Sequence, residues 1–242
     1  MRIVTTLLAF ACLAPSVMSA GCDSDSEDPK VTLLTYQGTM VDALDSSPLA
    51  GVEICVVSPS GIPCVTTDSN GHYVLANMPA STRVQATVQK DSYFPVFASF
   101  TTRTTDFTID AVLLQTSLVE VAFTGAGITL DTTKGAILVR AYDPALGLTS
   151  AVAGISGEIA PDEGDGPVYN DGAVFGSDTA TTASGTWAVV NLAAGTYQVK
   201  SSGAGRTCPG TFHWAGSNGA DWIETPVRAG FVSYVYVDCP AE

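Results

Sequence analysis

Side chains that could carry out catalysis are few and widely separated in this sequence. The chain has two histidines, His72 and His213, and the residues three positions after them are Leu75 and Gly216. A zinc peptidase site of the His-x-x-Glu type is therefore missing. Serines are plentiful, but none lies in the Gly-x-Ser-x-Gly turn that exposes a catalytic nucleophile. The sequence predicts a protein that is not an enzyme.

Four carboxylates gather in a Gly- and Pro-rich stretch, residues 160–172. Carboxylate oxygens are hard ligands that calcium prefers, but the regular acidic ladder and closing glutamate of an EF-hand loop are missing. A loop of this length is usually functional or disordered. Two interpretations stay open, a calcium site and a solvated loop. The calcium candidates, and the only cofactor candidate, are Asp162, Glu163, Asp165 and Asp171.

Residues 207–222 place two of the three tryptophans in a Gly-rich stretch. Indole rings beside Asn and Asp side chains suit sugar binding, because a ring stacks on a sugar face while polar groups bind its hydroxyls. Packing of the same rings against the end of a β-sandwich is the alternative. The candidate ligand-binding residues are Trp214, Trp222 and His213.

One sequence unit occurs twice and indicates the architecture. Residues 67–79 form a polar turn opening on glycine, then an aromatic residue and an apolar run ending at Asn, and residues 182–192 repeat this order. Such a unit predicts a β-turn that leads into a strand, so two copies predict two similar β domains. His72 has no counterpart in the second copy, which marks the unit as a feature of the fold. The shared positions are Gly71 and Gly185, Asn77 and Asn191, and the aromatic pair Tyr73 and Trp187.

The first 21 residues are typical of a secretory signal peptide. A cation at Arg2 precedes an apolar run, and the run ends in small residues. Residues 19–22 resemble a bacterial lipobox, in which cleavage occurs before a cysteine that receives diacylglycerol. The resemblance implies that Cys22 is lipidated and holds the protein to a membrane, since joined acyl chains give stable anchoring. Cleavage after Ala20 to give a free secreted protein is the alternative.

Residues 22–31 are rich in charge and read as a short acidic tether. Asp23 resembles an inner-membrane retention signal of enteric bacteria, a rule that varies with lineage, and we favour the outer membrane slightly. The whole chain carries a formal charge of −14, and loss of the signal removes the cation Arg2. This field repels phosphate backbones, which argues against a nucleic acid partner.

Cys12 belongs to the signal peptide, and Cys22 is the predicted site of lipidation. Setting these two aside leaves four cysteines. An even set in an exported chain predicts two disulfides. Three pairings are possible, and proximity along the chain favours the two local ones. Neither spacing is that of a zinc knuckle. The favoured pairs are Cys55 with Cys64 and Cys208 with Cys239.

The first half of the exported chain resembles a known family. Gly38, residues 48–52, residues 67–73, residues 77–79 and residues 93–95 fall in order and together resemble the carboxypeptidase regulatory-like domain. The resemblance covers residues 32–115, here called the first module. It implies a transthyretin-like seven-stranded β-sandwich that is noncatalytic and serves display, adhesion or docking.

Residues 116–242, here called the second module, repeat these motifs more loosely, with predicted strands at 135–142 and 231–239. The predicted fold class is therefore all-β: two tandem transthyretin-like or Ig-like β-sandwich domains after a signal peptide, residues 1–21, and an acidic tether. We expect a noncatalytic envelope lipoprotein that displays modules for a protein or glycan ligand. A purely structural spacer, or an accessory subunit of a hydrolase, is the alternative.

Overall fold

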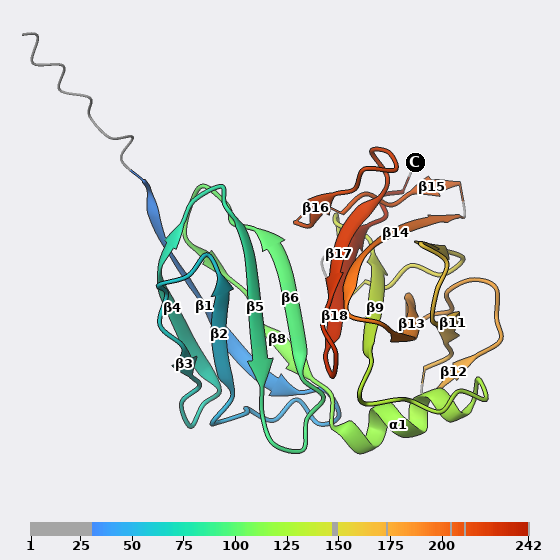
Figure 1. Ribbon diagram of the computed structural model, residues 1–242, viewed down its shortest axis with the longest axis horizontal. Coiled ribbons are helices and arrows are strands. Elements are labelled where there is room, and N and C mark those ends of the chain that lie inside the picture. Colours follow the sequence, from blue (N-terminus) through green and yellow to red (C-terminus); the bar gives the residue numbers. More distant parts are fainter. Residues whose placement is uncertain (1–30, 147–149, 173, 204, 211, 242) are drawn as a thin grey trace, which may run out of the picture. The chain divides into compact units, whose positions relative to one another are not determined.

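The computed structural model describes residues 31–146, 150–172, 174–203, 205–210 and 212–241. The predicted signal peptide, Cys22 and nearly all of the tether lie outside these residues. Val31–Glu242 forms one compact unit, and its described elements are eighteen strands and one short helix (Figure 1). The all-β prediction is confirmed. Among the described residues, no helix has the length and apolar character needed to cross a membrane.

The first module folds as two facing sheets. In one sheet β1 lies between β4 on one side and β7 and β8 on the other, and the second sheet has the order β3-β2-β5-β6. Inward and outward positions alternate along β1, as expected for a strand with one buried face. The strands are β1 Leu33–Asp42, β2 Glu53–Ser58, β3 Val65–Thr66, β4 His72–Pro79, β5 Arg83–Gln89, β6 Val96–Thr101, β7 Phe107–Thr108 and β8 Ala111–Leu113.

The second module also has two sheets, with the orders β10-β14-β17-β16 and β12-β11-β13-β9-β18, and β15 pairs with β14. The strand predicted over residues 135–142 is β9, and the last predicted strand is β18. The elements are β9 Gly135–Tyr142, β10 Ser156–Ala160, β11 Asp165–Asn170, β12 Phe175–Gly176, β13 Thr186–Leu192, β14 Gly195–Gly203, β15 Arg206–Thr207, β16 Trp214–Ala215, β17 Ile223–Val227 and β18 Val232–Asp238.

The two modules share one sheet. Strand β18 pairs with β9 along its whole length and touches β6 through the parallel pair Val232 and Val96. The sheet therefore runs continuously from β12 to β3 through nine strands, and Figure 1 shows β6 and β18 side by side. The predicted boundary at residues 115 and 116 falls between β8 and the helix, and the division into two domains there stays a prediction.

The two copies of the sequence repeat share a pair of threonine hydrogen bonds. The Thr67 hydroxyl donates to the Leu49 carbonyl at 2.6 Å and accepts the Val52 N–H at 2.9 Å. The Thr181 hydroxyl donates to the Val152 carbonyl at 2.8 Å and accepts the Ile155 N–H at 3.0 Å. Threonine thus fastens the same turn in each module. Asn77 and Asn191 share a positive φ, 62° and 59°, so the repeated unit has the same backbone conformation at this position in both modules.

The repeat has glycine at a position where a Cβ would clash with the backbone of a neighbouring strand. Gly71 has φ +73°, and a Cβ there would lie 2.4 Å from the Met40 carbonyl oxygen. Gly185 has φ +63°, and its Cβ would lie 2.5 Å from the Ala141 carbonyl oxygen. The backbone turn in each module therefore packs against the first strand where only hydrogen fits.

We expect Gly71→Ala to lower the free energy of unfolding by more than the roughly 1–2 kcal/mol that a left-handed backbone costs a residue with a Cβ, because a backbone clash is added. Gly61→Ala is the matched control, since Gly61 has φ +95° and no atom within 4 Å of its missing Cβ. Urea denaturation of both variants checks this. Equal losses would contradict the role assigned to the close approach at Gly71.

One element was not predicted, and one local prediction is wrong. Helix α1, Thr116–Thr124, occupies residues without a predicted helix; it buries Val119 and Phe123 one turn apart, and Phe123 stacks on Phe175 at 4.5 Å. The stretch 160–172 contains strand β11, which pairs with both β12 and β13, so it is a folded part of the sheet. Burial of apolar side chains against neighbouring elements overrides the local preference in both places.

Both predicted disulfides are present, Cys55–Cys64 and Cys208–Cys239. The first joins Cys55, within β2, to the residue just before β3. The second is fully buried and joins the end of β18 to the segment after β15. The last strand of the second module is thereby tied to the opposite sheet.

Candidate functional site

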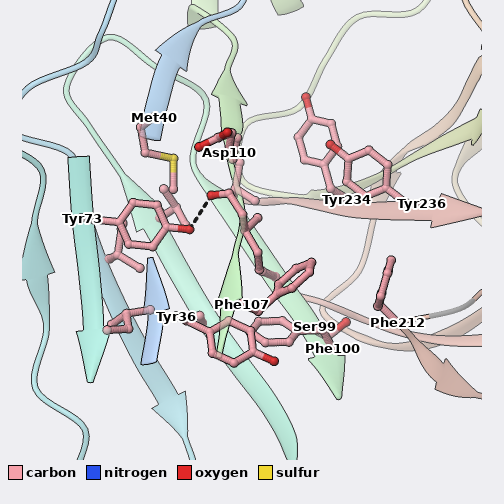
Figure 2. A pocket seen from close by; sticks show the side chains of 18 of the residues that line it. Tyr36, Met40, Tyr73, Ser99, Phe100, Phe107, Asp110, Phe212, Tyr234 and Tyr236 are labelled. Atoms are coloured by element: carbon pink, nitrogen blue, oxygen red, sulfur yellow. Dashed lines mark hydrogen bonds between the residues drawn. The ribbon is translucent and has the colours of Figure 1, made fainter. Parts of the chain in front are cut away.

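A cavity of about 390 Å³ lies between the two sheets of the first module and opens toward β18 of the second module (Figure 2). Its lining is mainly aromatic and aliphatic, and this volume is within the range of small-ligand sites. Both modules contribute, since β1, β4, β6 and β7 supply the inner part while β18 and the segment before β16 supply the outer part. The cavity is the candidate functional site.

The inner end of the cavity is apolar. Met40, Leu75 and Ile54 line it together with the ring of Tyr73. The Tyr73 hydroxyl donates to the Ile109 carbonyl at 2.8 Å, and burial together with the nearby charge of Asp110 raises the pKa of Tyr73. This end therefore offers hydrophobic contact, with its phenol already partnered.

The outer end is formed by two tyrosines from β18. Tyr234 and Tyr236 lie on one face of the strand with ring centroids 6.5 Å apart, and Figure 2 shows both at one side of the cavity. Burial raises the pKa of each phenol, so both are neutral near pH 7. Neither hydroxyl has a hydrogen-bond partner in the described part of the chain. The two phenols are free to bind a ligand oxygen.

Two charged side chains border the cavity. The Arg103 guanidinium lies over the ring of Phe107 at 3.7 Å and over that of Phe212 at 4.4 Å, an arrangement that favours the cation. It forms no ion pair with any described residue. Asp110 is exposed, and its Oδ1 accepts the Thr39 N–H at 2.8 Å. The cavity thus has one unpaired cation and one carboxylate that is held by the backbone.

His213 and Trp214 lie at the junction of the modules, beside this cavity. His213 Nδ1 is 3.0 Å from the Ser99 carbonyl, and its Nε2 accepts the Tyr236 N–H at 2.9 Å. The Trp214 indole donates to the Phe100 carbonyl at 3.0 Å. These bonds use both ring nitrogens of His213 and the single donor of Trp214, so the two residues fasten the second module to β6.

The fastening by His213 predicts a dependence of stability on pH. Burial lowers the pKa of His213 from 6.5 to about 4, so between these values the unfolded chain binds the extra proton. The free energy of unfolding should therefore keep its maximal value above pH 6.5. It should fall as the pH decreases toward 4, by up to roughly 3 kcal/mol. Urea denaturation at pH 7.5, 5.5 and 4.5 measures this loss.

His213→Asn should flatten that pH dependence, because the titrating group is gone. His72→Asn is the matched control, since it removes the other histidine, which is exposed. A slope that survives in the His213 variant would show that other groups cause it.

Trp222 lies apart from this junction. It is partly exposed, and the Lys200 ammonium is 6.0 Å from its ring centroid. Lys200 also pairs with Glu158 at 3.5 Å. The structure therefore brings His213 and Trp214 together, at the cavity, and leaves Trp222 on another part of the second module.

The predicted calcium ligands are not gathered into one site. Within the described ranges, no three His, Cys, Asp or Glu side chains lie close enough to hold a metal ion. Glu163 accepts a hydrogen bond from the Tyr197 hydroxyl at 3.1 Å, and Asp165 accepts one from the Asn191 amide at 2.5 Å. Asp162 and Asp171 are exposed. Two of the four carboxylates thus serve contacts within the second module.

Sequence reasoning missed the cavity residues. Tyr234 and Tyr236 were visible as alternate positions of the last strand, but that pattern gives no sign that their face meets another module. Arg103 and Phe107 lie in a stretch without a motif. Only the pairing of β6 with β18 brings these four residues together.

No protein-family model matches the sequence, and no curated protein matches it. Matching solved structures include a shaft pilin from Lactobacillus rhamnosus GG, with 10% identity over 88% of this chain and 99% of that chain at a TM-score of 0.27. A minor pilin of Streptococcus agalactiae has 12% identity over 86% and 96% at 0.27. The Bacillus anthracis TIE protein has 12% identity over 86% and 34% at 0.29.

This chain covers 34% of the TIE protein chain, which is the first match, and 56% and 62% of the chains in the second and third matches. Because these TM-scores are all below 0.5, we take neither fold nor function from the matches.

Proposed function

We propose that this protein is a noncatalytic, exported lipoprotein that binds an apolar ligand in the cavity of its first module. The observation that carries the proposal is the 390 Å³ cavity with its aromatic lining. A glycan would need many polar partners there, so the lining favours an apolar ligand over a sugar. The resemblance of the first module to carboxypeptidase regulatory-like domains supports a binding role.

Export and anchoring belong to the same proposal. The lipobox-like residues around Cys22 support attachment to the bacterial envelope, with the outer membrane favoured. The two disulfides fit an oxidising compartment. Mass spectrometry of the mature N-terminus should find an acylated Cys22, and an unmodified cysteine there would rule out the anchor.

A neutral fluorescent probe tests the binding role. We would titrate N-phenyl-1-naphthylamine into the mature protein made soluble by Cys22→Ser, and we expect saturable binding at one site. Ala98→Leu, which adds volume to the cavity lining, should weaken binding at least about tenfold. Ala76→Leu is the matched control, because Ala76 is exposed on β4. Unsaturable binding, or equal binding by both variants, would contradict the proposal.

The alternative is a structural spacer, and one observation favours it. The shared sheet and the bonds of His213 and Trp214 join the modules firmly, as a spacer would require. Absence of probe binding in a fully folded protein would favour this second function.

A further inference from the structure

We propose that the ligand of this cavity is an apolar carboxylic acid, with its apolar body at the inner end and its carboxylate among Arg103, Tyr234 and Tyr236. The inference rests on the proposed binding role and adds the chemical class of the ligand. It follows from three observations: arginines without a carboxylate partner, the position of these arginines beside the unpartnered phenols, and the difference between the polar and apolar ends of the cavity.

The first observation is that two arginines at or beside the cavity have no carboxylate partner, although the protein is acidic. The chain has a formal charge of −14, and Arg83, Lys200 and Arg206 each pair with a carboxylate. Five described cations have no such partner, and two of them, Arg103 and Arg140, lie at or beside the cavity; the others are Lys90, Lys134 and Arg228. The Arg140 Nε is in addition buried without a hydrogen-bond partner. A guanidinium left unpaired in acidic surroundings is suited to bind an anion from outside, above all a planar carboxylate.

The second observation is where these cations lie. Arg140 is the direct neighbour of Tyr236 across the β9–β18 pair, and its charge acts on the phenols of both Tyr234 and Tyr236. Arg103 borders the cavity itself and lies beside Phe107 and Phe212. The unpartnered phenols therefore lie in a positive field, where each can donate to a carboxylate oxygen.

The third observation is that the two ends of the cavity differ. Met40, Ile54 and Leu75 offer no polar atom, and the Tyr73 hydroxyl is already bound to Ile109. An aliphatic chain or aromatic ring gains contact there by leaving water. Asp110 acts on Tyr73 electrostatically, so an anionic group is repelled from that side. The ligand's orientation follows: body inward, carboxylate toward Arg103.

One further carboxylate lies near the polar end and is accounted for. Asp238 follows Tyr236 on the same face of β18 and is the direct neighbour of Tyr142. Burial, and after it a hydrogen bond to Asp238, raises the pKa of Tyr142. Asp238 Oδ1 is buried without a hydrogen-bond partner, and neither the Tyr234 nor the Tyr236 hydroxyl is bonded to this carboxylate, so both phenols are available to the ligand.

Paired probes test the inference. We would titrate cis-parinaric acid, a fluorescent polyene fatty acid, and its methyl ester into the mature protein carrying Cys22→Ser at pH 7.5. The acid should bind at least about tenfold more tightly, the effect of one charge-assisted contact. Arg103→Gln should reduce acid binding to the level of the ester and leave ester binding unchanged. Arg83→Gln is the matched control, because Arg83 pairs with Glu224 at 3.1 Å and lies outside the cavity lining.

The variants separate charge from packing. Arg103 also packs on two rings, so Arg103→Lys, which keeps the charge, should retain most of the preference for the acid. Tyr234→Phe and Tyr236→Phe keep the rings and remove the donors, and each should weaken binding of the acid about threefold to tenfold. Circular dichroism would show that each variant is folded.

The outcomes distinguish this inference from the proposed function. Equal binding of acid and ester, or displacement of the acid by decylamine at a lower concentration than by decanoic acid, would overturn the carboxylate assignment and leave an apolar binding site. Failure of acid, ester and neutral probe alike in the folded protein would overturn the binding role itself.

Discussion

Trp187→Ala should lower the free energy of unfolding by about 3–5 kcal/mol, the usual range for removing a large buried aromatic side chain. Trp187 is fully buried at the centre of the second module. Its indole donates to the Ser201 hydroxyl at 3.0 Å, and its ring lies 2.4 Å from where a Cβ at Gly157 would be. The alanine variant would lose this packing and leave the Ser201 hydroxyl without its donor.

The first module supplies the comparison. Tyr73 occupies the position of Trp187 in the repeat, but its ring already borders the cavity. We expect Tyr73→Ala to cost less than Trp187→Ala, because it enlarges an existing opening instead of creating a void. Guanidinium denaturation followed by circular dichroism measures both. A larger loss at Tyr73 would show that the cavity wall contributes more to stability than the closed core of the second module.

Removal of the Cys208–Cys239 disulfide by double alanine substitution should cost roughly 3.5–4 kcal/mol on the chain-entropy model. The two cysteines are 31 residues apart and fully buried. The bridge holds the end of β18, the strand that carries Tyr234 and Tyr236. We therefore expect ligand binding to weaken together with stability.

The Cys55–Cys64 bridge provides the control. Its partners are 9 residues apart, so the same model gives roughly 2.5 kcal/mol, and it lies outside the cavity. Denaturation of the two double variants in parallel, with probe titration below the transition, tests both statements. Equal probe affinity in the two variants would show that β18 keeps its position without the longer bridge.

The sequence predicted those parts of the fold that depend on local pattern. Strand β9 matches the strand predicted over residues 135–142. The turns at Gly71 and Gly185 are also present, and they were predictable because a tight turn with positive φ favours glycine. The local pairing of the cysteines was predictable for a similar reason, since short loops bring their ends together.

Features that depend on contacts between distant elements were not predictable. Helix α1 forms from a β-branched stretch because Val119 and Phe123 find an apolar surface near Phe175. The cavity depends on the contact of β6 with β18, whose residues are more than a hundred positions apart. No local pattern records which sheet edges meet, so the aromatic residues of the site carried no signal.

The way β6 is covered has a consequence for solubility. An uncovered sheet edge is a template onto which another chain can add a strand. Along β6 the Thr101 N–H donates to the Phe212 carbonyl at 2.9 Å. The carbonyls of the two preceding residues, Ser99 and Phe100, contact the side chains of His213 and Trp214. The bonds that fasten the modules therefore also close this edge to other molecules. Loss of the junction would be expected to produce aggregation before it produces two separate soluble modules.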